Sequence, residues 1–123
     1  MEYVNKIQEL ITAHPRLFKH ISTRSQSDLS QGWYKLVDEL CQQIDIVITD
    51  DEVASFEVLQ IKEKFGSLRF YFKASEKMRP RIKELVDLAY HKSIFSCDRC
   101  GEFRPPYSFP TFKLLCESCS ENE

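Results

Sequence analysis

Hydrophobic residues recur at helical spacing in the first half of the chain. The first such set is Val4, Ile7, Leu10 and Ile11. This helix should end near Ala13, because Pro15 disfavours helical angles in the residue before it. After the polar residues 22–31, which read as a loop, a second and longer helix is predicted, with Ser30 or Gly32 available to cap it. Its apolar positions are Trp33, Leu36, Val37, Leu40, Ile44 and Val47.

In the middle of the chain, apolar and polar residues alternate with a period of two, as in a β-strand. Residues 56–62 and 67–73 therefore predict two strands of a hairpin, in which Gly66 supplies the positive φ of a three- or four-residue turn with a bulge. The second strand should place Leu68, Phe70 and Phe72 on the core and turn Arg69, Tyr71 and Lys73 to the other side.

A third helix should begin near Ser75 and take Pro80 in its first turn. Its apolar stripe is Met78, Ile82, Leu85, Val86 and Ala89. The order of elements predicts an α+β fold: two helices, a β-hairpin and a third helix packed on one core, followed by a C-terminal four-cysteine zinc ribbon. We expect residues 1–95 to form the α+β domain and residues 96–123 to form the zinc knuckle packed on it, as a single compact unit.

Composition sets outer limits on this picture. A chain of 123 residues that is 42% hydrophobic is long enough for one domain with one core. The N-terminus mixes charged and apolar residues, unlike a signal peptide, and no run approaches the roughly 20 apolar residues of a membrane helix. We therefore expect a cytoplasmic protein with no membrane contact, in a compartment where paired cysteines more often bind metal than form disulfides.

The cysteines give the most specific chemical signal. Cys97 and Cys100 form one Cys-x-x-Cys pair, and Cys116 and Cys119 form a second one after fifteen residues. This spacing is typical of a zinc ribbon that holds one Zn²⁺, and four thiolates leave no open position for catalysis. The competing interpretation is a thiol redox site, which usually has one such pair. The fifth cysteine, Cys41, is expected to be a buried, inert thiol on the second helix.

No catalytic residues are predicted. His14, His20 and His91 lie in no motif with a nucleophile or carboxylate partner, and three glycines are too few for a phosphate-binding loop. We therefore expect a protein that is not an enzyme. The alternative is an active site assembled in space from residues far apart in the sequence.

The charges are unevenly distributed. Residues 38–57 hold seven acids and no Lys or Arg, whereas residues 60–83 hold eight bases and two acids. Two partner-binding surfaces are predicted: the outer side of the hairpin, with Lys62, Lys64, Arg69, Tyr71 and Lys73, and the proline-stiffened loop, with Arg104, Tyr107 and Phe109. The alternative is that these charges only solvate the fold, or that neighbouring helices cover the sheet.

The chain resembles a family of small phage, prophage and bacterial proteins that has no established activity. The resemblance spans about residues 32–119 and rests on Gly32-Trp33, on Lys62-Glu63-Lys64-Phe65-Gly66 followed by Leu68-Arg69-Phe70-Tyr71, and on Cys97-x-x-Cys100-Gly101. Where the family often has a second glycine, this chain has Ser67. The resemblance implies a shared fold and a mobile-element context, and it implies no substrate.

Together these features predict a non-enzymatic, zinc-stabilised protein that binds a protein partner. The acidic pI of about 5.9 and the aromatic residues of the Cys-rich loop favour this interpretation. The alternative is a nucleic-acid-binding regulator that uses the basic side of the hairpin.

Overall fold

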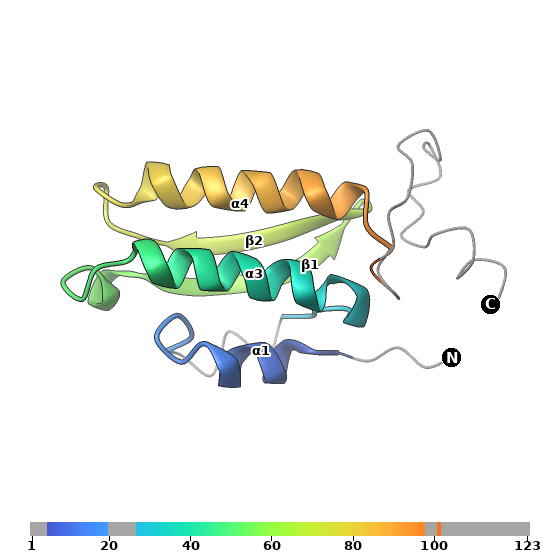
Figure 1. The fold of residues 1–123 in the computed structure, drawn as a ribbon, viewed down its shortest axis with the longest axis horizontal. Helices are drawn as coiled ribbons and strands as arrows, with labels where there is room; N and C mark the ends of the chain where they lie inside the picture. The colour runs from blue at the N-terminus through green and yellow to red at the C-terminus, as the bar shows by residue number, and fades with distance from the viewer. Residues whose placement is uncertain (1–4, 20–26, 98–100, 102–123) are drawn as a thin grey trace, which may run out of the picture.

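The computed structural model describes residues 5–19, 27–97 and 101 of the chain. In chain order its elements are α1 (Ile7–Ala13), α3 (Gln31–Val47), the 3-10 helix η1 (Val53–Ser55), β1 (Glu57–Lys64), β2 (Ser67–Lys73) and α4 (Arg79–Ile94). In Figure 1, α3 and α4 run alongside each other with the hairpin behind them, and α1 lies along the lower side. The predicted α+β class is confirmed for this part of the chain.

The hairpin follows the predicted alternation. Its strands are antiparallel, and Ile61 pairs with Phe70 on the inner side while Lys62 pairs with Arg69 on the outer side. A bulge at Leu59 interrupts the register between Val58 and Gln60. Because side chains alternate across a strand, Leu68 and Phe70 are buried and Tyr71 is exposed.

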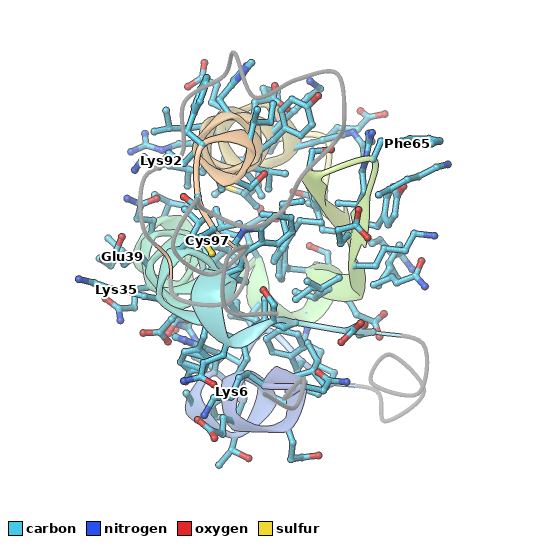
Figure 2. The ribbon with its side chains drawn as sticks, turned by 90° about the vertical axis from the view of Figure 1, so that its right-hand side faces the viewer. Lys6, Lys35, Glu39, Phe65, Lys92 and Cys97 are labelled. Carbon is cyan, nitrogen blue, oxygen red and sulfur yellow. The ribbon has the colours of Figure 1, made fainter. Side chains whose placement is uncertain are left out.

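Two long helices cover the inner side of the hairpin. Seen end-on in Figure 2, α3 and α4 lie on one side of the strands, and no described helix lies on the other. The core between these layers contains Trp33, Leu40 and Phe70, and the predicted members Leu36 and Phe72 are half-buried against it. Packing one apolar sheet face against helices is the arrangement that removes most of this surface from water.

The N-terminal residues contribute more to this core than the sequence suggested. Leu10, Leu17 and Leu29 are buried in it. The same segments lie along the edge of β1 that does not pair with β2. There the Val58 N–H donates to Leu17 O at 3.1 Å, and the Asp28 N–H donates to Ile61 O at 2.8 Å. The edge of β1 is therefore paired at these points rather than exposed.

The turn of the hairpin differs from the prediction. It is a two-residue loop, Phe65-Gly66, in which both residues have positive φ, +53° and +78°. The prediction of a three- or four-residue turn with a bulge was therefore wrong. Two consecutive positive φ angles match the right-handed twist of the strands, which is why short hairpins favour such turns.

Two helix starts also differ in detail from the prediction. Ser30 precedes α3 but makes no side-chain cap, and its buried Oγ has no hydrogen-bond partner. Ser75 instead forms a turn before α4, which begins at Arg79 with Pro80 in its first turn. Within the described residues, no helix has the length and apolar character needed to cross a membrane.

Candidate functional site

The side of the hairpin that faces away from α3 and α4 is predominantly basic. We call it the outer face. By the register of the strands, it carries four basic residues and one carboxylate, Glu57. Its other residues are Gln60, Lys62, Lys64, Ser67, Arg69, Tyr71 and Lys73, of which Ser67 is buried. The five hairpin residues predicted to bind a partner thus lie together on one side of the sheet.

Cations and aromatic rings are paired on and around this hairpin. Lys62 Nζ lies 5.9 Å from the centre of the Tyr71 ring, and Lys64 Nζ lies 5.7 Å from that of Phe65. Such pairs are attractive because the negative face of the ring meets a positive charge. Tyr71 is 43% exposed, so its ring remains accessible beside the lysine. The outer face therefore presents aromatic area and positive charge together.

Arg69 is less accessible than its neighbours on the outer face. Its guanidinium carbon lies 5.6 Å from the centre of the Tyr90 ring, which extends from α4. Its Nε is buried and has no hydrogen-bond partner. Arg69 therefore packs partly against the fold, as the covered-sheet alternative expected for a cation at the rim.

Two serines secure the edges of the hairpin. The Ile61 N–H on β1 donates to Ser27 Oγ at 3.0 Å, and the Leu68 N–H on β2 donates to Ser93 Oγ at 2.8 Å. Ser93 Oγ in turn donates to Tyr90 O within α4 at 2.7 Å. Buried backbone donors need partners, so these serines fix both strands against the rest of the fold. The outer face is consequently held on a rigid support.

The first Cys-x-x-Cys pair begins at a buried position. Cys97 is fully buried, and the Gly101 N–H donates to Cys97 O at 2.9 Å. Gly101 has a φ of +81°, and a Cβ there would lie 2.9 Å from Gly32 O. A glycine is therefore required at this position both by its backbone angle and by its contact with the start of α3.

The predicted zinc site extends beyond what the structure describes. Cys97 is described, whereas Cys100, Cys116 and Cys119 lie outside the described residues. So do Arg104, Tyr107 and Phe109 of the second predicted binding surface. Among residues 5–19, 27–97 and 101, no three His, Cys, Asp or Glu side chains form a group that could hold a metal ion. The zinc ribbon thus stays a prediction.

One histidine has a partner that the sequence did not reveal. His14 is buried, and its Nε2 lies 2.6 Å from Asp38 Oδ1 on α3. Asp38 Oδ2 also accepts from Gln42 Nε2 at 2.9 Å. No sequence motif around His14 indicates this partner, because the two residues are 24 positions apart in sequence. The pair ties the end of α1 to α3.

The other candidates for acid–base or thiol chemistry fit structural roles. Burial raises the pKa of the Cys41 thiol far above its usual range, and the carboxylates of Asp38 and Asp45 add to this effect. Cys41 therefore remains a protonated thiol, as expected for an inert core cysteine. His91 is exposed, with its ring 5.2 Å from that of Tyr90 in an edge-on contact, and His20 lies outside the described residues.

The acidic stretch is partly neutralised by the N-terminal segment. Arg16 reaches the end of α3, where its guanidinium lies 2.7 Å from Asp45 Oδ1 and also donates to the backbone oxygen of Ile48 at 3.4 Å. A second carboxylate, that of Asp50, lies 3.5 Å away. A cation at a helix C-terminus also interacts favourably with the exposed carbonyl groups there. Asp45 and Asp50 therefore help to hold the N-terminal segment against the end of α3.

A cavity of about 700 Å³ lies between the start of α3, the end of α4 and Gly101. Its described charged groups are Lys35, Glu39 and Lys92, which Figure 2 places on the opposite side of the molecule from Phe65. Its other described lining residues are Gln31, Gly32, Leu36, Phe95, Ser96 and Gly101. This described lining contains no histidine and no cysteine, and its one side-chain hydroxyl, that of Ser96, donates to the main-chain oxygen of Lys92 at 2.8 Å.

Comparisons with protein-family models, with curated proteins and with solved structures give no match for this chain. The resemblance to small phage and bacterial proteins stays a prediction. Two features that matter for the site went unnoticed in the sequence: the positive φ of Phe65 and the His14–Asp38 pair. The positive φ of Phe65 could not be seen in the sequence, because an aromatic residue before a turn glycine does not indicate it. The His14–Asp38 pair could not be seen either, because the two residues come together only in the folded chain.

Proposed function

We propose that this chain is a non-enzymatic, zinc-stabilised binding protein whose outer face contacts a protein partner. The observation that carries the proposal is the outer face itself: basic side chains and an exposed tyrosine on a hairpin whose edges are both hydrogen-bonded to the rest of the fold. Rigid surfaces bind at a smaller entropic cost than mobile ones. Because the outer face is predominantly basic, the partner is expected to carry acidic groups.

Exposed apolar side chains favour a protein over a nucleic acid as the partner. Leu59, at the bulge of β1, is 46% exposed, and Phe65 at the turn is 66% exposed. An aliphatic side chain such as that of Leu59 offers a nucleic acid neither stacking nor a hydrogen bond. Protein interfaces, in contrast, combine an apolar and aromatic centre with a polar rim.

Zinc has a structural role in this proposal. The buried Cys97 and the hydrogen bond it accepts from Gly101 support a knuckle that begins on the fold, with Cys100, Cys116 and Cys119 completing the four thiolates. Such a site contributes folding energy outright when the metal binds. Arg104, Tyr107 and Phe109 then form a second binding surface on the loop that the metal closes.

A nucleic-acid-binding regulator is the second candidate. The observation that favours it is the pairing of cations with aromatic rings along the hairpin, including Lys62 with Tyr71. Basic groups interleaved with aromatic rings are typical of surfaces that bind single strands. In that case binding would weaken steeply with salt, because each neutralised phosphate releases counterions.

Affinity purification of the tagged full-length protein from its native cells, with and without nuclease treatment, separates the two candidates. We expect a discrete protein partner whose recovery is unchanged by nuclease and falls on washing with concentrated salt. If recovery disappears after nuclease treatment, the nucleic-acid candidate replaces ours. If nothing is recovered under either condition, the binding proposal itself fails.

A further inference from the structure

The tip of the hairpin contains a backbone conformation that its side chain disfavours. Phe65 has a φ of +53°, in the left-handed region that glycine and asparagine adopt most readily. Asn-Gly is the usual pair for a two-residue hairpin turn with two positive φ angles, yet this chain has Phe-Gly. A strained residue persists only where the surrounding structure enforces it, and such residues cluster at functional positions.

Two side-chain hydrogen bonds hold this turn in place. The Gly66 N–H donates to Glu63 Oε2 at 2.9 Å, and Ser67 Oγ donates to Lys64 O at 2.9 Å. The first bond joins a loop residue to β1, and the second joins the two residues that flank the loop, so both oppose relaxation of Phe65. The conformation is therefore built into the hairpin by its neighbours in the sequence.

The strained turn exposes a large apolar side chain. Phe65 is 66% exposed, and Figure 2 shows it at the edge of the molecule, directed away from the side that carries Lys35, Glu39 and Lys92. Asparagine adopts this conformation with less strain, so the turn carries an exposed aromatic ring at a position that its backbone disfavours. The Phe65 ring beside Lys64 is suited to entering a pocket, as the central aromatic residues of protein interfaces do.

We infer that Phe65 is the anchor of the partner-binding surface, inserting into an apolar pocket of a protein partner whose rim is acidic. This inference rests on the proposed function and adds the chemistry of the contact. The acidic rim follows from charge, since Lys62 and Lys64 lie on β1 next to the turn and outnumber the one carboxylate between them in the sequence, that of Glu63. Complementary charges would orient the partner as the ring enters.

The substitution Phe65→Asn tests this inference because it should change stability and binding in opposite directions. Asparagine tolerates the left-handed conformation, so Tm should rise by about 2–4 °C. Recovery of the protein partner by the tagged full-length chain from native cells should fall at least tenfold. Phe65→Tyr, which keeps the ring, should retain the partner, and Ile46→Asn at an exposed position of α3 should do so as well.

The outcomes separate this inference from the proposed function. If the wild-type chain and Phe65→Asn recover the partner equally, the anchor is wrong and the binding function stands. If Phe65→Asn lowers Tm, the strain argument is wrong. Recovery that is insensitive to salt contradicts the acidic rim, and recovery lost on nuclease treatment shows a nucleic acid in place of the protein. If the wild-type chain recovers nothing, the proposed function fails together with the anchor.

Discussion

The indole Nε1 of Trp33 donates a hydrogen bond of 3.0 Å to the main-chain oxygen of Ser96. This bond joins the first turn of α3 to the residue before Cys97, across 63 positions of sequence. Gly101 reaches the same place, since a Cβ on it would lie 2.9 Å from Gly32 O. The residues at which the predicted zinc knuckle begins therefore contact the core through two consecutive residues, Gly32 and Trp33.

This attachment makes Trp33 a reporter of the proposed zinc site. We expect about one zinc per chain by native mass spectrometry. Chelation should loosen the knuckle and shift Trp33 fluorescence to the red, because the buried indole would gain access to water. Cys41→Ser should leave the zinc content unchanged, since Cys41 lies on α3 inside the core. Purified protein without zinc, with Cys97 in a disulfide under reducing conditions, would contradict the site.

Ser93 on α4 should contribute to stability because its hydroxyl accepts a hydrogen bond from the backbone N–H of Leu68. Ser93→Ala leaves the Leu68 N–H buried without an acceptor, which should lower the free energy of unfolding by about 1–3 kcal/mol. Ser96→Ala is a matched control: both hydroxyls donate to a backbone oxygen near the end of α4, but Ser96 Oγ holds no strand. Equal stability of the two variants in urea unfolding would show that Ser93 does not secure β2.

The His14–Asp38 pair should be worth more than an exposed ion pair. Asp38→Ala leaves the buried imidazole without its partner and should cost about 1–3 kcal/mol. Asp87→Ala, which removes the exposed partner of Lys83 on α4, should cost less than about 0.5 kcal/mol. The measurement is urea unfolding of both variants beside the wild type. Comparable losses would mean that α1 is not fixed to α3 through this pair.

Cys41 gives a prediction in pH. Because burial raises the pKa of its thiol in the folded protein, the unfolded chain loses this proton first as pH rises. The protonated Cys41 thiol therefore makes its full contribution to the free energy of unfolding below about pH 8, and this contribution is lost progressively above about pH 9. Native Cys41 should also resist alkylation at pH 9 and react only after unfolding. Rapid alkylation of Cys41 in the native protein, located by peptide mass mapping, would show that the thiol is accessible.

The hairpin and the long helices could be predicted because their patterns are local. Apolar and polar residues alternate over residues 67–73, which predicts a strand with one side on the core. The structure places Phe70 inside and Tyr71 outside as expected. The spacing of Trp33, Leu40 and Ile44 likewise defines one face of α3, and all three are buried. Local periodicity is sufficient where one face of an element packs against the core.

The remaining features depend on contacts between distant segments or on strain. Leu17 and Leu29 flank a polar stretch in the sequence, and only their position along β1 explains why they are buried. The turn could not be predicted correctly because phenylalanine disfavours positive φ, whereas Glu63 and Ser67 stabilise it there. Arg69 lies on the outer face as expected, and its additional contact with Tyr90 could not be predicted because it depends on how α4 packs.

The most direct test of the proposed function compares two double variants in binding to the recovered partner. Lys62→Ala with Tyr71→Ala removes a cation–aromatic pair from the outer face, whereas Lys35→Ala with Ile46→Ala removes an exposed lysine and an exposed apolar residue from α3. Titration calorimetry should show Kd weakened at least tenfold, about 1.4 kcal/mol, for the first pair and unchanged for the second. A Kd within twofold of wild type for Lys62→Ala with Tyr71→Ala would contradict binding through the outer face.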